Sequence, residues 1–519
     1  MNGLKRAAIY AALLLFTAGT LAAQDVALTS RDGSVELSGT LLGFDGEFYR
    51  VETEYGELTV DSSGVSCAGP GCPSLADFVA EARLSGSATV GAVLMPALVE
   101  AFAARQGYKL DREEGEEGRF TLLLSREDNG KLAARFDFRA SNTDEGFADL
   151  LADEADIVMA LREVRREERI NAREAGLGDL TAVNRSRVLA LDAVVPVVAP
   201  ANPVKQISPQ TLARVFAGEI NNWQRLGGPD APISLHLPNE RSGLSQAIFD
   251  QVLAPAGLEL APDVTRHALP DDLTDAVERD AFAIGITSYA EHGGTEVLTL
   301  GGNCGFALDA ARRTIKTEDY PLTAPMFLYF PARRLPLIMR EFLAFTRSPA
   351  AQIVIRRAGF VDQAPEEIPI EEQGNRFANA IIVAGGETPL EELQRMTSTL
   401  VPMARLTTSF RFEAGSIRLD AQSRSNVQQL ARAMEQGQYD ARRLMFVGFS
   451  DSEGAARANR DIALRRAEAV RRAVSAAAVT ANLSRIDLRV DAFGEAMPMA
   501  CDDSEWGRQA NRRVEVWVR

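Results

Sequence analysis

The chain has 519 residues, of which 46% are hydrophobic and 25% are charged, a composition typical of globular proteins and a length that favours several domains. Its 72 acidic residues outnumber its 56 lysines and arginines, and the net charge of −16 disfavours a nucleic acid as partner because the phosphate backbone would repel the protein. The 3 histidines and 4 cysteines show no zinc-ligand spacing, so we expect neither a metal centre nor a cofactor.

Residues 1–23 have the features of a secretory signal peptide. Lys5 and Arg6 give a basic start, residues 7–16 form an apolar run, and small residues follow up to Ala23. A membrane-spanning helix needs about 20 apolar residues, which is more than this run contains. We therefore expect export into an oxidising compartment, where disulfides persist.

Residues 24–74 predict a small module of β-strands. Apolar residues alternate in VELSGTLLGF, FYRVETEY and GELTVD, and glycine-containing turns separate these segments. Cys67 and Cys72 are close enough in sequence to form a disulfide, which would leave Cys304 and Cys501 to pair; four cysteines allow three pairings, so the others stay open. We assign this module a connecting or interaction role.

Residues 75–363 alternate between strand-like and helix-like segments, which predicts an α/β domain with largely parallel strands and, given its length, two lobes. Residues 364–404 include an acidic, proline-bearing stretch, which we interpret as a linker or domain margin. The strand candidates are 155–160, 193–199 and 282–286, and a helix is expected over 91–105.

Residues 405–519 predict a second, compact α/β unit. LTTSFRF, LMFVGF and RRVEVWV are strand-like, and apolar residues recur at helical spacing over 427–434, before a further helix over 459–474.

The motifs of this unit resemble the OmpA-like peptidoglycan-binding domain: GFSDSEGAARANRDIALRRAEAV, FGEAMP and GRQANRRVEV occur in that family's order. In the family, an aspartate and an arginine bind the diaminopimelate group of the stem peptide, which implies these roles for Asp451 and Arg466. The chemistry is suitable, because a carboxylate and a guanidinium can hold the two charges of a zwitterion. Asn459, Asn511 and Arg512 also match the family pattern and are assigned to the peptidoglycan site; the alternative for Asn511 and Arg512 is that they brace the last strand. The alternative for an aspartate and an arginine is a solvated surface pair.

The middle region resembles the periplasmic phosphate-binding proteins of ABC importers, from LSGSATVGAVLMPALVEAFAARQG through ADIVMALREV to ANPVKQISPQTLARVFAGEINNWQRLGGPDAPI. The resemblance implies a bilobal fold with an oxyanion in the central cleft, held by N–H groups and hydroxyls at helix N-termini. The residues that would bind the anion are Ser87, Ala88, Thr89, Ser141, Asn142, Arg162, Arg241, Ser242 and Gly243.

Some positions depart from this resemblance. Leu244 stands where the family usually has threonine, and Pro238 and Glu240 stand where it has arginine and aspartate. A serine or threonine at such places is also a common helix N-cap, which is the alternative for each hydroxyl.

The expected fold class is therefore α/β, with a bilobal periplasmic-binding-protein-like domain between a small β module and an OmpA-like domain. The expected function is a periplasmic solute-binding protein for phosphate or a similar oxyanion, associated with the cell wall through peptidoglycan. The alternative is a wall-anchored scaffold or docking protein whose solute-binding domain has lost its ligand. An ABC permease or an envelope sensor is the implied protein partner. The chain has no G-x-S-x-G, H-E-x-x-H or P-loop motif, so we do not expect an enzyme.

Overall fold

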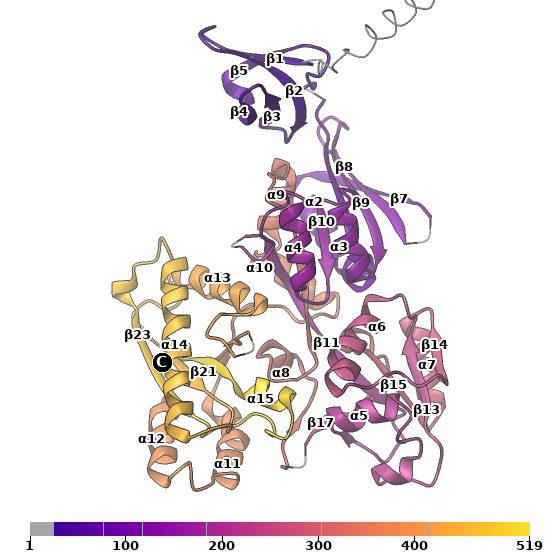
Figure 1. The fold of residues 1–519 in the computed structure, drawn as a ribbon, viewed down its shortest axis with the longest axis vertical. Helices are drawn as coiled ribbons and strands as arrows, with labels where there is room; N and C mark the ends of the chain where they lie inside the picture. The colour runs from indigo at the N-terminus through magenta and orange to yellow at the C-terminus, as the bar shows by residue number, and fades with distance from the viewer. Residues whose placement is uncertain (1–24, 76, 117, 183, 303, 414) are drawn as a thin grey trace, which may run out of the picture.

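The computed structural model describes residues 25–519 apart from 76, 117, 183, 303 and 414. The expected signal peptide, residues 1–23, lies outside the described residues. A small β module, a two-lobed middle domain and a C-terminal domain follow one another along the chain, and the C-terminal domain lies beside the second lobe (Figure 1). Within the described residues, every helix is too short or too polar to cross a lipid bilayer.

The N-terminal module is an antiparallel sheet in the order β4-β3-β2-β1-β5. Val26, Leu28, Tyr49 and Val51 form its buried centre, because alternate side chains of a strand point to the same face. The disulfide Cys67–Cys72 closes the module, as the sequence predicted. The elements are β1 (Val26–Ser30), β2 (Glu36–Phe44), β3 (Phe48–Thr53), β4 (Gly56–Asp61), η1 (Ser62–Gly64) and β5 (Val65–Ala68).

The middle domain is built on a large sheet, in the order β14-β13-β15-β11-β19-β10-β6-β9-β8-β7, with β16 also paired to β11, and has a small second sheet in the order β12-β17-β18. The long strand β11 joins the lobes, since residues 186–193 pair with β19 and residues 194–198 pair with β15 of the second lobe. Pairing is parallel at the centre of each lobe, around β6 and β13, but antiparallel elsewhere. The expectation of largely parallel strands was therefore wrong, because β11 and β19 run in opposite directions where they connect the lobes and because β7, β8 and β9 form an antiparallel edge.

The first lobe contains β6 (Ala80–Ser87), η2 (Thr89–Leu94), α2 (Met95–Gln106), β7 (Tyr108–Glu114), β8 (Arg119–Arg126), β9 (Leu132–Ser141), α3 (Thr143–Leu151), β10 (Ile157–Ala160), α4 (Arg166–Glu174), α9 (Leu337–Phe345) and α10 (Pro349–Arg357). The strands shared between lobes are β11 (Ser186–Val198) and β19 (Thr323–Tyr329). The expected strands at 155–160 and 193–199 correspond to β10 and the second half of β11, and the expected helix at 91–105 to η2 and α2.

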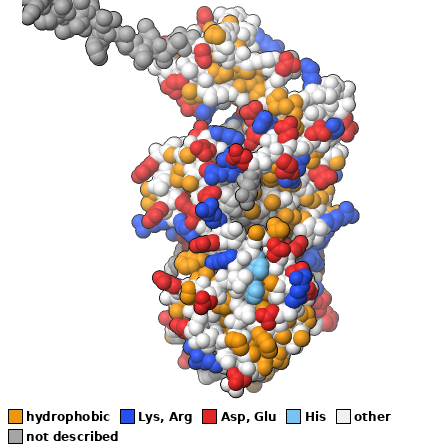
Figure 2. All heavy atoms as spheres, turned by 90° about the vertical axis from the view of Figure 1, so that its right-hand side faces the viewer, with side chains coloured by type: hydrophobic (Ala, Val, Ile, Leu, Met, Phe, Trp, Pro, Cys, Tyr) orange, Lys and Arg blue, Asp and Glu red, His pale blue; other side chains and the backbone are white. Residues whose placement is uncertain are grey.

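The second lobe contains the third expected strand, 282–286, as β15. Its elements are β12 (Gln206–Ile207), α5 (Pro209–Phe216), η3 (Trp223–Leu226), β13 (Ser234–Pro238), α6 (Gly243–Ile248), η4 (Phe249–Leu253), η5 (Ala254–Ala256), β14 (Val264–His267), α7 (Pro270–Arg279), β15 (Ala283–Ser288), η6 (Tyr289–Glu291), β16 (Glu296–Val297), β17 (Thr299–Gly301), β18 (Ala307–Leu308) and α8 (Arg312–Lys316). Over the face seen in Figure 2, acidic and basic side chains are interspersed.

The C-terminal domain is a sheet in the order β20-β21-β24-β22-β23 with helices on both faces. Leu430 of α13 and Val470 of α14 pack in the core on one face, and Leu393 and Met396 of α12 pack on the other. Its elements are β20 (Glu367–Ile368), η7 (Ile370–Gln373), α11 (Gly374–Ile382), α12 (Leu390–Leu400), β21 (Ala404–Phe410), α13 (Ala421–Glu435), β22 (Arg443–Phe449), α14 (Ala456–Ala477), η8 (Leu483–Arg485), β23 (Asp487–Gly494), α15 (Glu505–Asn511) and β24 (Arg513–Val518).

Residues 364–404 are therefore not a linker, which corrects the sequence interpretation: they supply one edge strand and two helices of the C-terminal domain. The acidic, proline-bearing composition is not specific for a linker, because acidic residues and prolines are also common at helix N-termini. Pro389 precedes α12, and Glu391 and Glu392 occupy its first turn.

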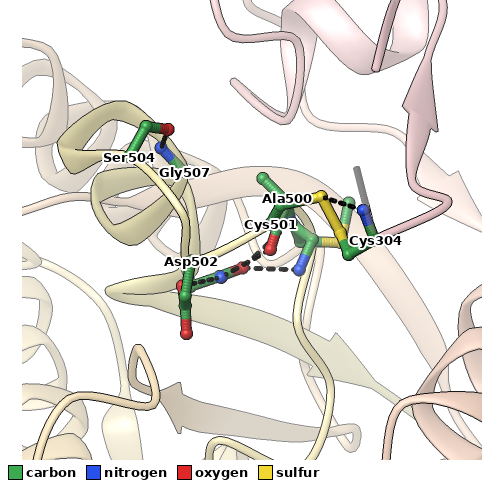
Figure 3. The surroundings of a disulfide bond; sticks show 8 residues. Cys304, Ala500, Cys501, Asp502, Ser504 and Gly507 are labelled. Carbon is green, nitrogen blue, oxygen red and sulfur yellow. Dashed lines mark hydrogen bonds between the residues drawn. A yellow bond between two sulfur atoms is a disulfide. The ribbon is translucent and has the colours of Figure 1, made fainter. Parts of the chain in front are cut away.

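The C-terminal domain is fixed to both lobes. In the first lobe, Oε1 of Glu163 accepts a hydrogen bond from the N–H of Ala421 at 2.7 Å, and α13 packs against β11. In the second lobe, Cys304 forms a disulfide with Cys501, the pairing that the Cys67–Cys72 bond implied. Figure 3 shows this bond beside the turn that leads into α15.

Candidate functional site

Four of the expected anion-binding residues meet in two pairs across the lobes, Ser87 with Gly243 and Asn142 with Arg241. Ser87 ends β6 of the first lobe, and Gly243 begins α6 of the second. A Cβ atom added to Gly243 would lie only 2.7 Å from Oγ of Ser87, so glycine is required for this close approach. Nearby, Nδ2 of Asn142 in the first lobe donates a hydrogen bond to the carbonyl of Arg241 in the second, at 3.3 Å.

Ser87 has the properties of a ligand-binding group. It is 0% exposed, and its Oγ has no hydrogen-bond partner within the described residues. Buried hydroxyls are normally paired, so this one is available to a bound group. Ala88 and Thr89 follow at the start of η2 and are half-buried.

Two of the expected residues are helix N-caps. Oγ of Ser242 accepts a hydrogen bond from N of Ser245 at 3.0 Å, and Oδ1 of Asn142 accepts one from N of Glu145 at 2.9 Å. Their side chains thus satisfy the first turns of α6 and α3. Ser141 directs its Oγ to the carbonyl of Asn142 at 3.5 Å, a weak contact.

The guanidinium group of Arg162 forms ion pairs with carboxylates of its own chain. Its Nη2 lies 2.6 Å from Glu168 and also pairs with Asp144. Burial lowers the pKa of Arg162, but hydrogen bonds with Glu168 and Asp144 outweigh it and raise the pKa. The neighbouring Arg165 forms an ion pair with Asp250 of the second lobe at 2.9 Å. Arg162 therefore lies at the lobe boundary as part of an ion-pair network.

The expected peptidoglycan residues form a second cluster in the C-terminal domain. Asp451 follows β22, and its Oδ2 lies 2.8 Å from Nη1 of Arg512. Arg466 of α14 is 5% exposed; its guanidinium lies over the ring of Phe412 at 5.2 Å, and its Nη2 donates to the carbonyl of Ser416 at 3.4 Å.

The electrostatics of Arg466 favour an anionic ligand. Burial and the positive charge of Arg512 lower its pKa, and the negative charge of Asp451 raises it. Its Nε has no hydrogen-bond partner in the part of the chain that the structure describes. Arg512 also pairs with Glu505, which leaves Asp451 and Arg466 as the carboxylate and the guanidinium for a ligand with an ammonium and a carboxylate.

Asn459 and Asn511 have bracing contacts. Nδ2 of Asn459 donates to Glu495 at 3.0 Å. Oδ1 of Asn511 accepts from the N–H groups of Met499 and Ala500, at 2.6 and 3.1 Å. Asn511 thus shapes the loop that carries Cys501.

Two family models match the chain. A model described as a PBP superfamily domain matches residues 79–350, about half of the chain. The chain belongs to the PBP superfamily. An OmpA family model matches residues 411–512, so the PBP-superfamily domain is fused to a C-terminal OmpA-family domain.

Protein SphX of Synechococcus elongatus is 25% identical to this PBP-superfamily chain over 264 residues, which cover 47% of this chain and 76% of SphX. The phosphate-binding protein PstS of Staphylococcus haemolyticus is 25% identical over 215 residues, which cover 40% of this chain and 65% of that protein. The crystal structure of an ABC-type phosphate transport receptor from Vibrio cholerae matches with a TM-score of 0.41 and 20% identity, covering 54% of this chain and 99% of the receptor.

Sequence reasoning missed the aromatic and carbonyl partners of Arg466 in the OmpA-family domain. Phe412 and Ser416 lie in the loop after β21, far from the motif residues in sequence, and no periodicity or charge pattern marks them. It also missed Gly86 of the PBP-superfamily domain, which has φ of +131° and approaches Met159 so closely that a Cβ would lie 2.1 Å from its carbonyl oxygen. The sequence did contain a signal for this close approach, because Gly86 is the glycine of the SGS string at residues 85–87, in the segment that carries the family resemblance.

Proposed function

We propose that this protein binds phosphate or a similar oxyanion between the lobes of its PBP-superfamily domain and is held at the cell wall, in the periplasm, by its OmpA-family domain. The observation that carries the proposal is the meeting of Ser87 and Gly243 across the lobes, with a buried hydroxyl left unpaired. The name of the PstS relative agrees with it, since PstS is a phosphate-binding protein.

The anion would be held by Oγ of Ser87 and by N–H groups at the starts of η2 and α6, where helix N-termini favour negative charge. Ala88, Thr89 and Gly243 would contribute main-chain donors, and Arg241 a positive charge. Ser242 would act by shaping the start of α6, and Asn142 by shaping the start of α3, because their side chains cap those helices. No covalent step is required.

Calorimetric titration of the full-length protein with phosphate tests the solute-binding part. We expect saturable binding, with sulfate at equal ionic strength as the comparison anion. Ser87→Ala should weaken binding about ten-fold, the effect of one lost hydrogen bond to a charged group, whereas Ser63→Ala, an exposed serine of the N-terminal module, should not change it. Absence of binding to either anion would refute the proposal for the lobes.

The wall-binding part rests on the cluster of Asp451, Arg466 and Arg512. Diaminopimelate would place its ammonium at Asp451 and its carboxylate at Arg466, exchanging the Asp451–Arg512 pair for contacts with the ligand. Arg466→Ala should release the protein from purified sacculi in a sedimentation assay, because the ligand carboxylate then has no buried partner.

The matched control for sedimentation is Arg465→Ala, an exposed arginine on the same helix. Asp451→Asn and the exposed Asp461→Asn form a second pair that differs only in the position of the lost charge. Equal sedimentation of Arg466→Ala and Arg465→Ala, or of the two asparagine variants, would refute the assigned pocket.

A second candidate function is a wall-anchored scaffold without a ligand between the lobes. The ion pairs of Arg162 with Glu168 and Asp144 favour the scaffold function, since that arginine is not available to an anion. The phosphate titration separates the two functions, because a scaffold would retain sacculus binding without binding phosphate. An ABC permease or envelope sensor remains the partner that we propose for the solute-binding function.

A further inference from the structure

A cavity of about 280 Å³ lies where the two lobes and the OmpA-family domain meet. The first lobe contributes Glu163, and the segment before β19 contributes Glu318. The OmpA-family domain contributes Asp420, Gln422 and Trp506. We name this space the junction cavity; it is separate from the meeting point of Ser87 and Gly243 and from the Arg466 cluster.

The junction cavity is lined by three carboxyl groups, those of Glu163, Glu318 and Asp420, and by the two guanidinium groups of Arg162 and Arg411. Burial and the charge of Asp420 raise the pKa of Glu163 to about 7 and that of Glu318 to about 8. Arg411 opposes this for Glu318, but its guanidinium also faces Asp319 at 3.5 Å, so it compensates only in part. A positively charged occupant would relieve this repulsion.

Several buried polar atoms on the cavity wall lack a hydrogen-bond partner among the described residues. They are Oε1 of Gln422, Oε1 of Gln251, Nη1 of Arg411 and Nε of Arg162. Gln422 is 3% and Arg411 is 5% exposed. Because buried polar atoms are normally paired, the two glutamine oxygens are free to accept hydrogen bonds from an occupant that donates them, whereas the two arginine nitrogens need a separate acceptor such as water.

Aromatic side chains complete the wall. Trp506, Tyr320 and Phe327 line the cavity, and the indole N–H of Trp506 donates to the carbonyl of Pro321 at 3.2 Å, which fixes its ring. Aromatic faces attract cations and pack against carbon. In the described residues, no group of three or more acidic, histidine or cysteine side chains is placed to hold a metal ion.

We propose that the junction cavity binds a small organic ammonium ion, a primary amine on a short carbon chain. The ammonium group donates to the carboxylates of Glu318 and Asp420 and to Oε1 of Gln422, and the carbon chain packs on Trp506. Because the wall comes from both lobes and from the OmpA-family domain, a bound amine holds the three bodies together and stabilises their docked arrangement.

Ethylammonium chloride, titrated into the full-length protein at pH 8, tests this proposal. We expect a saturable change in tryptophan fluorescence and a rise in the thermal midpoint, neither of which sodium chloride produces at equal ionic strength. Glu318→Gln should raise the apparent Kd about ten-fold, since it replaces a charged hydrogen-bond acceptor with a neutral one. Glu387→Gln, an exposed glutamate outside the cavity, should match the unaltered protein.

Trp506→Phe locates the binding independently of Glu318. Because Trp223 and Trp517 are fully buried elsewhere, the fluorescence change should vanish in this variant, while the midpoint still rises. The proposal is overturned if ethylammonium acts no differently from sodium, if Glu318→Gln and Glu387→Gln respond equally, or if the fluorescence change persists in Trp506→Phe.

Discussion

The disulfide Cys304–Cys501 should contribute more to stability than the disulfide Cys67–Cys72. The first joins residues separated by 197 positions, and the second by 5. A disulfide restricts the unfolded chain by closing a loop, and the entropy removed grows with the logarithm of loop length. At 25 °C this relation gives about 5 kcal/mol for the long loop and about 2 kcal/mol for the short one.

The test compares Cys304→Ser/Cys501→Ser with Cys67→Ser/Cys72→Ser. Urea unfolding is followed by tryptophan fluorescence and by circular dichroism, and each transition is fitted separately because several domains need not unfold together. We expect the first variant to lose about 3 kcal/mol more than the second, the difference between the two loop terms. An equal loss, or a smaller one for the junction variant, would refute the reasoning from loop closure.

Three other predictions concern the lobe contact, the junction cavity and the wall-domain loop. Gly243→Ala should weaken phosphate binding and enlarge the radius of gyration in X-ray scattering, since its Cβ would meet Ser87; adding Ser87→Gly should restore the radius. The thermal midpoint should fall as the pH rises from about 5 to about 8, because Glu163 and Glu318, whose pKa values rise from 4.5 to about 7 and about 8, bind protons more tightly in the folded protein over this range; Glu318→Gln should reduce the fall. The charged and polar groups that face Glu163 and Glu318 are Asp420, Glu413, Arg424, Arg411, Asp319 and Asn426. Asn511→Ala should lower the free energy of unfolding by about 2 kcal/mol, because buried N–H groups lose their acceptor, yet leave sacculus sedimentation of the folded protein unchanged.

Local patterns predicted the elements well and the contacts between domains poorly. The apolar strings at 155–160 and 282–286 became β10 and β15, because a buried strand needs only its own side chains to be recognised. The motif around Asp451 likewise placed its charge beside Arg512 and near Arg466. Both successes depend on residues that are close in sequence or fixed by a family pattern.

The pairing of Arg162 could not be predicted in the same way. Its carboxylate partners come from α3 and α4, and the adjoining Arg165 reaches η4 of the other lobe. These contacts depend on how helices pack after the chain has folded, and an arginine after a strand has the same sequence pattern whether it binds an anion or a glutamate. The contact between the domains could not be predicted from the sequence either, because Glu163 and Ala421 are separated by 258 positions in the chain.

Attachment to both lobes has a mechanical consequence for the OmpA-family domain. Its Cys501 is covalently bound to Cys304 of the second lobe, and its Ala421 contacts Glu163 of the first. If the lobes separated as rigid bodies about β11 and β19, the distance between Glu163 and Cys304 would change, whereas the distance between Ala421 and Cys501 is fixed within one folded domain. One of the two attachments must therefore yield when the lobes open. Because the disulfide is covalent, we expect lobe opening to break the weaker contacts with the first lobe, namely the Glu163–Ala421 hydrogen bond and the packing of α13 on β11, so that the OmpA-family domain moves with the second lobe.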